Sequence, residues 1–300
     1  AGGATSARSL RSSMLSALGN VELCFLLVQA VLLYRILRDL NLIDLDRLLA
    51  AIKPPAGSPV STGGSACISD EALTEGQRRT FVKLNSTGSR GFYGDDLLRA
   101  LVHCNHNEAQ TDALLLRNRA WLDLVKPKQV TPVQLGASLQ AGALRLGGFS
   151  RCGWPVVEVH VERWQPDQPY ATEQARDALL GFAYEHALQR LPAGQDRLLL
   201  LVDLTGWGVS HGPLVSTALS LMQGAYVERL GVALLVNAPA LFRATWAFTK
   251  PLLDERVSSR VVVLGDEWQP AVAEHIDEDN LPQALGGKHP PKGPPAFGFL

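Results

Sequence analysis

The chain has 300 residues, of which 46% are hydrophobic and 19% charged, a balance typical of a folded chain with a large core. Its 28 Lys and Arg against 29 Asp and Glu give a net charge of −1, which argues against broad nucleic-acid binding, because that function shows as a basic excess. The four cysteines lie far apart without a CxxC pair, which favours reduced thiols over zinc or redox motifs, with two disulfides as the alternative.

Residues 1–52 form a predicted N-terminal tail and amphipathic helix. The first 20 residues contain two Arg and no acid among many Ser and Ala, which resembles part of an organelle transit peptide; a disordered tail is the alternative. The uncharged run from Leu23 to Tyr34 is shorter than the ~20 residues that a membrane-spanning helix needs, and charges flank it closely. We therefore expect residues 21–49 to lie on a membrane surface, pack on the protein's own domain or bind a partner.

A helical lead-in domain is predicted at 67–150, after a linker at 53–66 that is rich in Pro, Gly and Ser. Within it, residues 71–85 favour a short helix. The next segment, 85–96, has the length of an EF-hand loop, but Arg90 stands where that loop needs Gly and too few residues are acidic. An ordinary helix–helix loop is therefore predicted there.

From Trp154 onward, strands alternate with helices. PVVEVHVE alternates Val with Glu and His, which predicts a half-buried strand. The elements that follow are a helix at 171–191, a buried strand at 197–204, a helix at 213–230, a strand at 231–238, a helix at 239–253 and a strand at 260–265. This alternation predicts an α/β layer with mostly parallel strands.

The helix at 239–253 carries one large apolar face. Phe242, Trp246, Thr249 and Leu253 recur at spacings of four, three and four, so they share a face. Such a face beside two apolar strands is either core packing or the wall of a lipid cavity.

The pattern G-x-S-x-G at 208–212 indicates an alternative, the nucleophile elbow of an α/β-hydrolase. Ser210 would be the nucleophile, with an acid and a base such as Asp254 and His275 further along the chain. However, residues 203–207 separate Ser210 from the buried strand, and the sequence has no HGGG-type loop for a second oxyanion donor. We therefore predict that the protein is not an enzyme, with the Ser210 hydrolase as the weaker hypothesis.

Four segments in sequence resemble the CRAL-TRIO lipid-binding family of the secretory phosphatidylinositol-transfer type. They are the lead-in helices at 95–122, DRLLLLVDLTG at 196–206, the run ERLG, VNAP, KPLLD and RVVVLG at 228–265, and DNLPQALGG at 279–287. The resemblance implies an α/β fold at 151–288, with a small mixed, mostly parallel sheet flanked by helices. The sheet would form the floor of a lipid pocket, closed by the helix at 239–253 as a gate.

The same resemblance implies a protein that binds, and transfers between membranes, a hydrophobic ligand such as a phospholipid or an isoprenoid. The pocket residues would be Leu198, Leu200, Val202, Leu235, Phe242, Trp246, Thr249, Val261 and Val263. Glu228, Arg229 and Arg260 are the headgroup candidates, because Arg suits bidentate phosphate contacts. A salt bridge at the helix–strand corner is the alternative for these three residues.

Two departures from the family pattern bear on the ligand. The basic pair of the family's lead-in helix would fall near Cys104 and Asn105, where this chain has no cation, which weakens the prediction of an inositol lipid. Choline-lipid binders carry hydroxyls where this chain has Leu198 and Leu200, which speaks against phosphatidylcholine. The remaining lining is hydrocarbon and suits a ligand of little polarity.

The predicted partners are the lipid, a membrane surface and other proteins, with no nucleic acid among them. Proteins would dock on residues 1–50 and on the Pro-rich tail. The tail covers 289–300, or 288–300 if Lys288 is counted with it. The predicted location is the cytoplasm or an organelle, mitochondrion or plastid, at a membrane periphery. No metal and no cofactor other than a bound lipid or isoprenoid is predicted. A scaffold subunit of a membrane-associated complex with the same fold is the second hypothesis.

Overall fold

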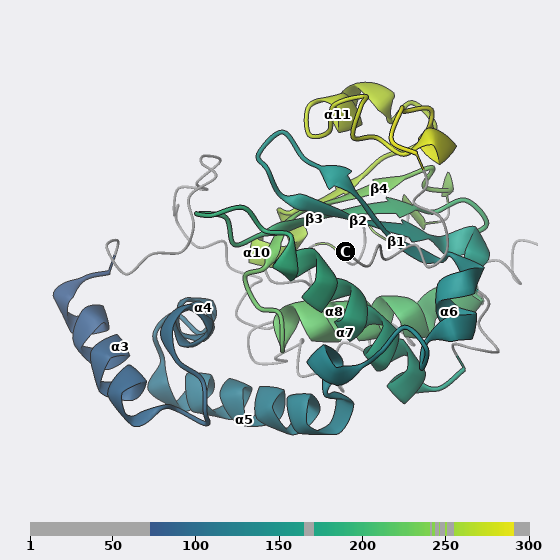
Figure 1. Ribbon diagram of the computed structural model, residues 1–300. Helices are drawn as coiled ribbons and strands as arrows, with labels where there is room; N and C mark the ends of the chain where they lie inside the picture. Colours follow the sequence, from purple (N-terminus) through teal and green to yellow (C-terminus); the bar gives the residue numbers. More distant parts are fainter. Residues whose placement is uncertain are drawn as a thin grey trace, which may run out of the picture. The chain divides into compact units, whose positions relative to one another are not determined.

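The computed structural model describes residues 73–164, 171–240, 242, 243, 246, 250 and 255–290 (Figure 1). The predicted N-terminal tail, linker and Pro-rich tail lie outside these residues, as does most of the helix predicted at 239–253. No helix in the described part of the chain is long and apolar enough to cross a membrane.

Three helices open the described part: α3 (Glu75–Thr87), α4 (Gly94–His103) and α5 (Glu108–Val125). Thr74 and Gln77 form a capping box at the start of α3, so two backbone N–H groups gain partners there. The three helices share one apolar cluster, which includes Leu97, Leu101, Leu114, Leu115 and Phe81. Between α3 and α4 the chain makes a tight turn through Gly88 and Arg90, both at positive φ, so the predicted helix–helix loop is confirmed.

A five-stranded sheet follows, after the short helices η2 (Pro127–Gln129) and α6 (Gly136–Ala141). Its strands lie in chain order: β1 (Leu144–Phe149), β2 (Pro155–His160), β3 (Leu198–Asp203), β4 (Leu230–Val236) and β5 (Val261–Val263). β1 pairs with β2 antiparallel, and the other neighbours are parallel. The small mixed, mostly parallel sheet is therefore confirmed, although the antiparallel edge strand β1 was not predicted.

Helices cover both faces of the sheet (Figure 1). On one face, α7 (Glu173–Gln189) and α8 (Gly212–Gln223) pack on side chains that include Leu198 and Leu200. On the other face, α11 (Gln269–Ala273) and the turns after it cover side chains that include Leu199 and Leu201. A strand that is covered on both faces reads as a continuous apolar run, which is why RLLLLVDL could be predicted as buried.

The predicted half-buried character of β2 was wrong. Glu158 and His160 each keep only 5% of their surface exposed, and the Val residues beside them are buried too. They point to the face that carries Val156, which the C-terminal segment also covers. The His160 Nε2 atom lies 3.4 Å from Glu158 Oε2, so each polar side chain has the other as a buried partner.

Helix ends follow local sequence signals in several places. Thr172 caps α7 by accepting a hydrogen bond from the Ala175 backbone N–H, as the sequence predicts. The helix predicted at 213–230 is shorter, because α8 ends at Gln223 and a turn leads into β4. The chain then closes on the turn of η6 (Gln283–Leu285), where a side chain at Gly287 would meet the Leu281 carbonyl at 2.1 Å.

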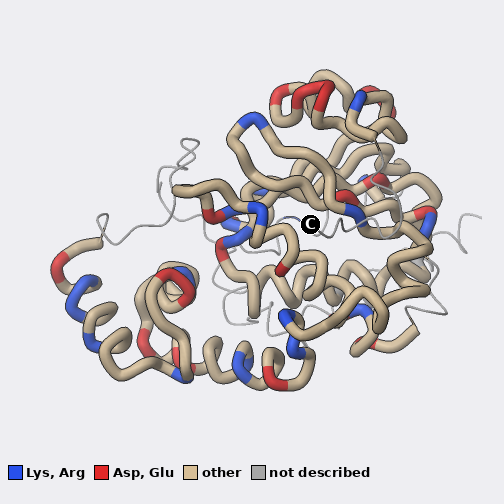
Figure 2. The backbone as a smooth tube through the Cα atoms, in the orientation of Figure 1, with Lys and Arg blue, Asp and Glu red and all other residues tan. Residues whose placement is uncertain are grey.

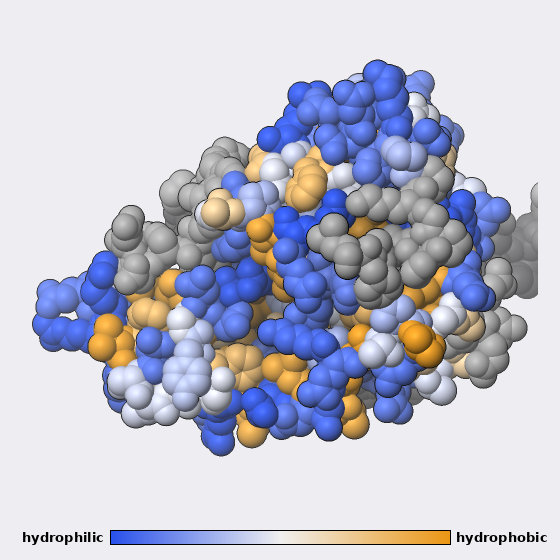
Figure 3. Space-filling view, viewed as in Figure 1, coloured by the Kyte–Doolittle hydropathy of each residue, from blue (hydrophilic) through white to orange (hydrophobic). Residues whose placement is uncertain are grey.

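Charge and hydropathy are distributed over the described elements without one dominating sign. Figure 2 shows Lys and Arg interleaved with Asp and Glu along the backbone. On the face drawn in Figure 3, hydrophilic residues predominate over α11 at the top, and apolar ones appear among them lower in the view. The exposed large apolar residues include Tyr93, Leu116 and Leu124 of the lead-in helices and their flanks.

Candidate functional site

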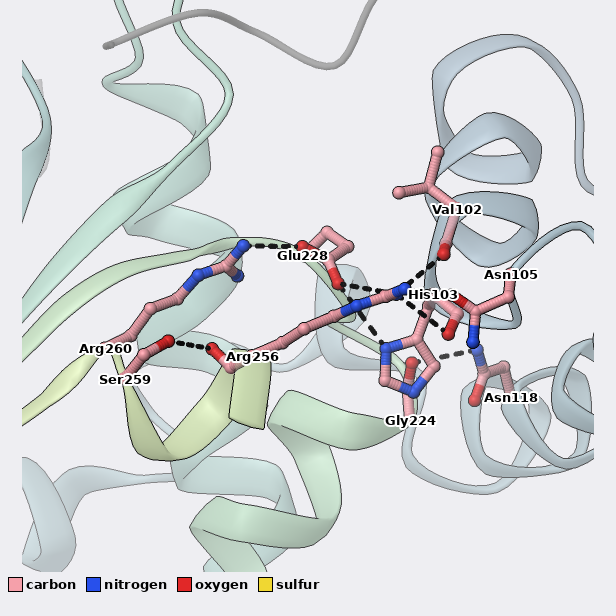
Figure 4. A network of polar contacts seen from close by, with 9 residues as sticks. All are labelled: Val102, His103, Asn105, Asn118, Gly224, Glu228, Arg256, Ser259 and Arg260. Carbon is pink, nitrogen blue, oxygen red and sulfur yellow. Dashed lines mark hydrogen bonds and ion pairs between the residues drawn. The ribbon is translucent and has the colours of Figure 1, made fainter. Parts of the chain in front are cut away.

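The buried carboxylate of Glu228 is the centre of a polar site at the start of β4 (Figure 4). Glu228 adopts a left-handed conformation with φ of 58°, and its side chain is only 5% exposed. Arg260, directly before β5, donates a hydrogen bond of 2.8 Å from Nη2 to Oε2. His103 Nδ1 lies 3.6 Å and Arg256 Nη1 3.9 Å from Oε1. Two arginines and a histidine thus face one carboxylate.

The electrostatics of this site keep Glu228 ionised. Burial alone raises the pKa of the carboxyl, because a charged group loses its hydration. The contacts of His103 and Arg260 outweigh burial and lower the pKa to about 2, from an ordinary value of 4.5. Glu228 is therefore an anion at any pH above about 2, and it holds the surrounding cations in place.

Arg256 joins this site to the C-terminal end of α4. It lies in α10 (Glu255–Ser258), and its Nη1 donates to the carbonyls of Val102 and His103, at 2.7 and 3.0 Å. Its Nη2 donates to the Asn105 side chain. The last carbonyls of a helix carry partial negative charge and lack partners within the helix, so a guanidinium suits this position. Arg256 therefore places positive charge at the end of α4, where the lead-in sequence itself has no cation.

The structure separates Arg229 from the other headgroup candidates. Its guanidinium donates to the Asp196 carbonyl at 3.0 Å and lies 3.4 Å from the Asp96 carboxylate. Burial, together with the nearby Arg99, lowers the pKa of Arg229. Of the three predicted residues, only Glu228 and Arg260 are in contact, and Arg256 joins them.

Most of the predicted pocket residues fall into two groups. Leu198 and Leu200 are 0% and 5% exposed beneath α7 and α8, so their side chains are covered by protein atoms. Val261 is partly buried at the edge of that same cluster.

A second, partly buried group lies near the carboxyl ends of the strands. Val202, Leu235, Phe242 and Val263 pack with Trp207 around Val161, Leu204 and Ala238. Trp246 is partly buried and helical, whereas Thr249 lies outside the described residues. The lipid-contact role of all these residues stays a prediction.

A polar pair fixes the strand ends next to this apolar cluster. Asp203 Oδ1 accepts hydrogen bonds from the Thr205 hydroxyl and the Asn237 amide, at 2.7 and 2.9 Å. The Asn237 Oδ1 in turn accepts from the Trp268 indole at 2.9 Å. The turns after β3 and β4 are thereby held together.

The sequence and fold together identify the family. A family model described as the CRAL/TRIO domain matches residues 139–287, from α6 to the closing turn. Residues 139–287 form a CRAL/TRIO domain. The crystal structure of Sfh5 shares its fold with a TM-score of 0.52 and 15% sequence identity, over 72% of this chain and 88% of that one.

Curated relatives match part of this CRAL/TRIO chain. The Sec14 cytosolic factor of Schizosaccharomyces pombe is 33% identical over 120 residues, covering 36% of this chain and 42% of that protein. The phosphatidylinositol/phosphatidylcholine transfer protein SFH7 of Arabidopsis thaliana is 35% identical over 86 residues, covering 29% of this chain and 16% of that protein. The match therefore spans less than half the length of these relatives.

In the CRAL/TRIO domain of this chain, Ser210 does not sit on a nucleophile elbow. β3 ends at Asp203, and Ser210 lies in the separate turn η4 (Val209–His211). The neighbouring His211 is buried and uses both ring nitrogens, at 3.0 Å from the Gly208 N–H and 3.1 Å from the Trp164 carbonyl. His211 thus stabilises the turn. Asp254, the acid of the hydrolase hypothesis, lies outside the described residues.

Proposed function

We propose that this protein binds a phospholipid-type ligand in its CRAL/TRIO domain and transfers it between membranes without catalysing a reaction. The observation that carries the proposal is the group of Glu228, Arg260, Arg256 and His103 at the start of β4 and β5. This polar group lies at one end of strands whose other end carries the partly buried apolar cluster around Trp207 and Phe242. The named activity of the SFH7 relative supports the same function.

The polar group matches the chemistry of an inositol phospholipid. Two guanidiniums against one carboxylate leave an excess of positive charge, and Arg260 is partly exposed, so a phosphate has a charged donor within reach. The ionised Glu228 accepts the hydrogen bond of Arg260 and so keeps that guanidinium in place for a phosphate. Arg256 offers the positive charge that the lead-in sequence lacks near Cys104 and Asn105. A phosphoinositide-type headgroup is therefore the ligand class that we propose for this site.

The acyl chains would supply most of the binding free energy. Each CH₂ removed from water is worth about 0.8 kcal/mol, so a single chain contributes on the order of 10 kcal/mol before ordering costs. The headgroup then needs to contribute selectivity alone. We expect the protein to work at a membrane periphery, in the cytoplasm or an organelle. The names of the relatives, Sec14 cytosolic factors, support the cytoplasm.

The test is a transfer assay between vesicles with radiolabelled phosphatidylinositol or phosphatidylcholine, combined with native mass spectrometry of the purified protein. The Arg260→Gln variant should lose at least tenfold of its phosphatidylinositol transfer, because a charge-assisted hydrogen bond contributes about 1.5–3 kcal/mol. Arg151→Gln is the matched control, since Arg151 pairs with Asp277 at the surface, 2.7 Å away. A protein that carries no lipid and loads none from mixed vesicles would refute the proposed function.

A further inference from the structure

Trp207 carries a buried hydrogen-bond donor with no acceptor. Its indole Nε1 is buried, and no oxygen or nitrogen in the described part of the chain accepts a hydrogen bond from it. Trp154 and Trp268 differ in this respect, because they donate to Gln195 and Asn237, both at 2.9 Å, whereas the buried Nε1 of Trp121 shares it. Buried indole N–H groups usually have an acceptor, because a buried donor without a hydrogen bond costs free energy.

The surroundings of Trp207 are apolar. The indole packs with the cluster of Val161, Leu204 and Ala238, and its ring lies perpendicular to that of Phe242 with 5.1 Å between centroids. The aromatic neighbour offers no oxygen or nitrogen atom. The side chains that complete this cluster are the partly buried Val202, Leu235 and Val263, which are predicted to line the pocket. The unmatched donor therefore belongs to the apolar end of the proposed pocket.

This donor is remote from the headgroup site. Glu228 and Arg260 precede β4 and β5, whereas Trp207 lies near the carboxyl ends of the strands. The seven residues of β4 span about 20 Å at roughly 3.3 Å per residue. Trp207 therefore meets a different part of a ligand, or a different ligand, from the phosphate that Arg260 would bind.

The acceptor that fits Trp207 is uncharged. The side chains packed around the indole are apolar, so an anion among them would lose its hydration. The carboxylate at the same strand ends, Asp203, is already held by Thr205 and Asn237 and would repel a second negative charge. A carbonyl, ester or ether oxygen within an otherwise apolar molecule is uncharged and can accept the indole hydrogen bond.

We propose that the Trp207 indole N–H is the hydrogen-bond donor for an uncharged acceptor oxygen of an apolar ligand, and that it makes the pocket prefer such ligands over plain hydrocarbons. This inference rests on the proposed lipid-binding function. It adds a second recognition point, at the far end of the strands from the headgroup site.

Matched ligands test the proposal. Methyl palmitate carries an ester acceptor and octadecane carries none, at similar length, and both radiolabelled probes can be partitioned from phosphatidylcholine vesicles into the full chain. We expect the wild-type protein to take up about ten times as much methyl palmitate as Trp207→Phe does, because one hydrogen bond to a buried donor is worth about a factor of ten in affinity. Uptake of octadecane should be equal in the two proteins, and Trp154→Phe should behave like the wild type.

A second readout uses the unaltered protein. In protein labelled with ¹⁵N-tryptophan, one indole N–H resonance should shift downfield with methyl palmitate and not with octadecane, and that resonance should be missing from Trp207→Phe. An equal uptake ratio in wild type and Trp207→Phe, or the absence of the selective shift, would overturn the proposal while leaving lipid binding intact. If neither probe enters any of the proteins, the proposed function fails first, and the role of Trp207 fails with it.

Discussion

Replacing Glu228 by Gln should make the stability difference from the wild type depend on pH. The pKa of Glu228 is about 2 in the folded protein, against an ordinary value of 4.5. Each tenfold change in proton affinity is worth about 1.4 kcal/mol, so the ionised carboxylate contributes about 3 kcal/mol to the free energy of unfolding at neutral pH. Because the folded-state pKa is the lower one, this contribution is complete above pH 4.5 and is lost as the pH falls towards 2.

Urea unfolding of both proteins, followed by circular dichroism at pH 7, 5, 4 and 3, measures this contribution. The gap between wild type and Glu228→Gln should be about 3 kcal/mol at pH 7 and fall to roughly half of that at pH 3. Glu278→Gln is the control, since Glu278 is 64% exposed and pairs with Lys288 at the surface. The free energies of unfolding of wild type and Glu278→Gln should differ by less than about 1 kcal/mol, as for other exposed ion pairs. A Glu228→Gln gap that is as large at pH 3 as at pH 7 would show that the carboxylate is not held by its cations.

Three further substitutions test the packing around the site. Arg256→Gln should lower the free energy of unfolding by about 1–3 kcal/mol, because the α4 carbonyls lose a charged donor. Arg119→Gln should change it by less than about 1 kcal/mol, because Arg119 and its partner Asp123 form an exposed ion pair; chemical denaturation compares the two. Gly231→Ala should cost about 1–3 kcal/mol, since the new methyl group would meet the Trp154 ring at 2.4 Å, and an unchanged thermal midpoint would contradict this contact. Thr172→Ala should cost about 1 kcal/mol through the lost cap of α7, and Thr172→Ser should restore most of it in the same melting experiment.

Periodicity was enough to predict strands β2 to β5 and helices α7 and α8, because each buried strand is a short run of aliphatic residues bounded by turn residues. It failed where burial has no local signature. In β2, Glu158 and His160 alternate with Val as in a strand that faces water, but the segment that packs on Val156, on the same face, lies more than a hundred residues later. β1 was missed because LRLGGF contains two glycines and a charge, which weaken the strand pattern.

The candidate site shows the same limit. The pairing of Glu228 with Arg260 followed from the resemblance to a known family. The part played by Arg256 did not, because its carbonyl partners on α4 are separated from it by about 150 residues and carry no side-chain signal. The contact of Arg229 with Asp96 could not be predicted for a related reason: adjacent residues at a turn point in different directions, and the fold decides which one meets Asp96. Every residue has a backbone carbonyl, so the residue types do not show which carbonyls at the end of α4 bind an arginine.

The order of the strands has a consequence for how the domain assembles during synthesis. Since β1 to β5 lie in the sheet in the order in which they occur in the chain, each new strand can add to the growing edge as it leaves the ribosome. The three-residue strand β5 is the last to join, and it brings Arg260 to Glu228. A nascent chain that ends before β5 would therefore hold a buried carboxylate without this cation, and the polar site would close only in the final step of assembly.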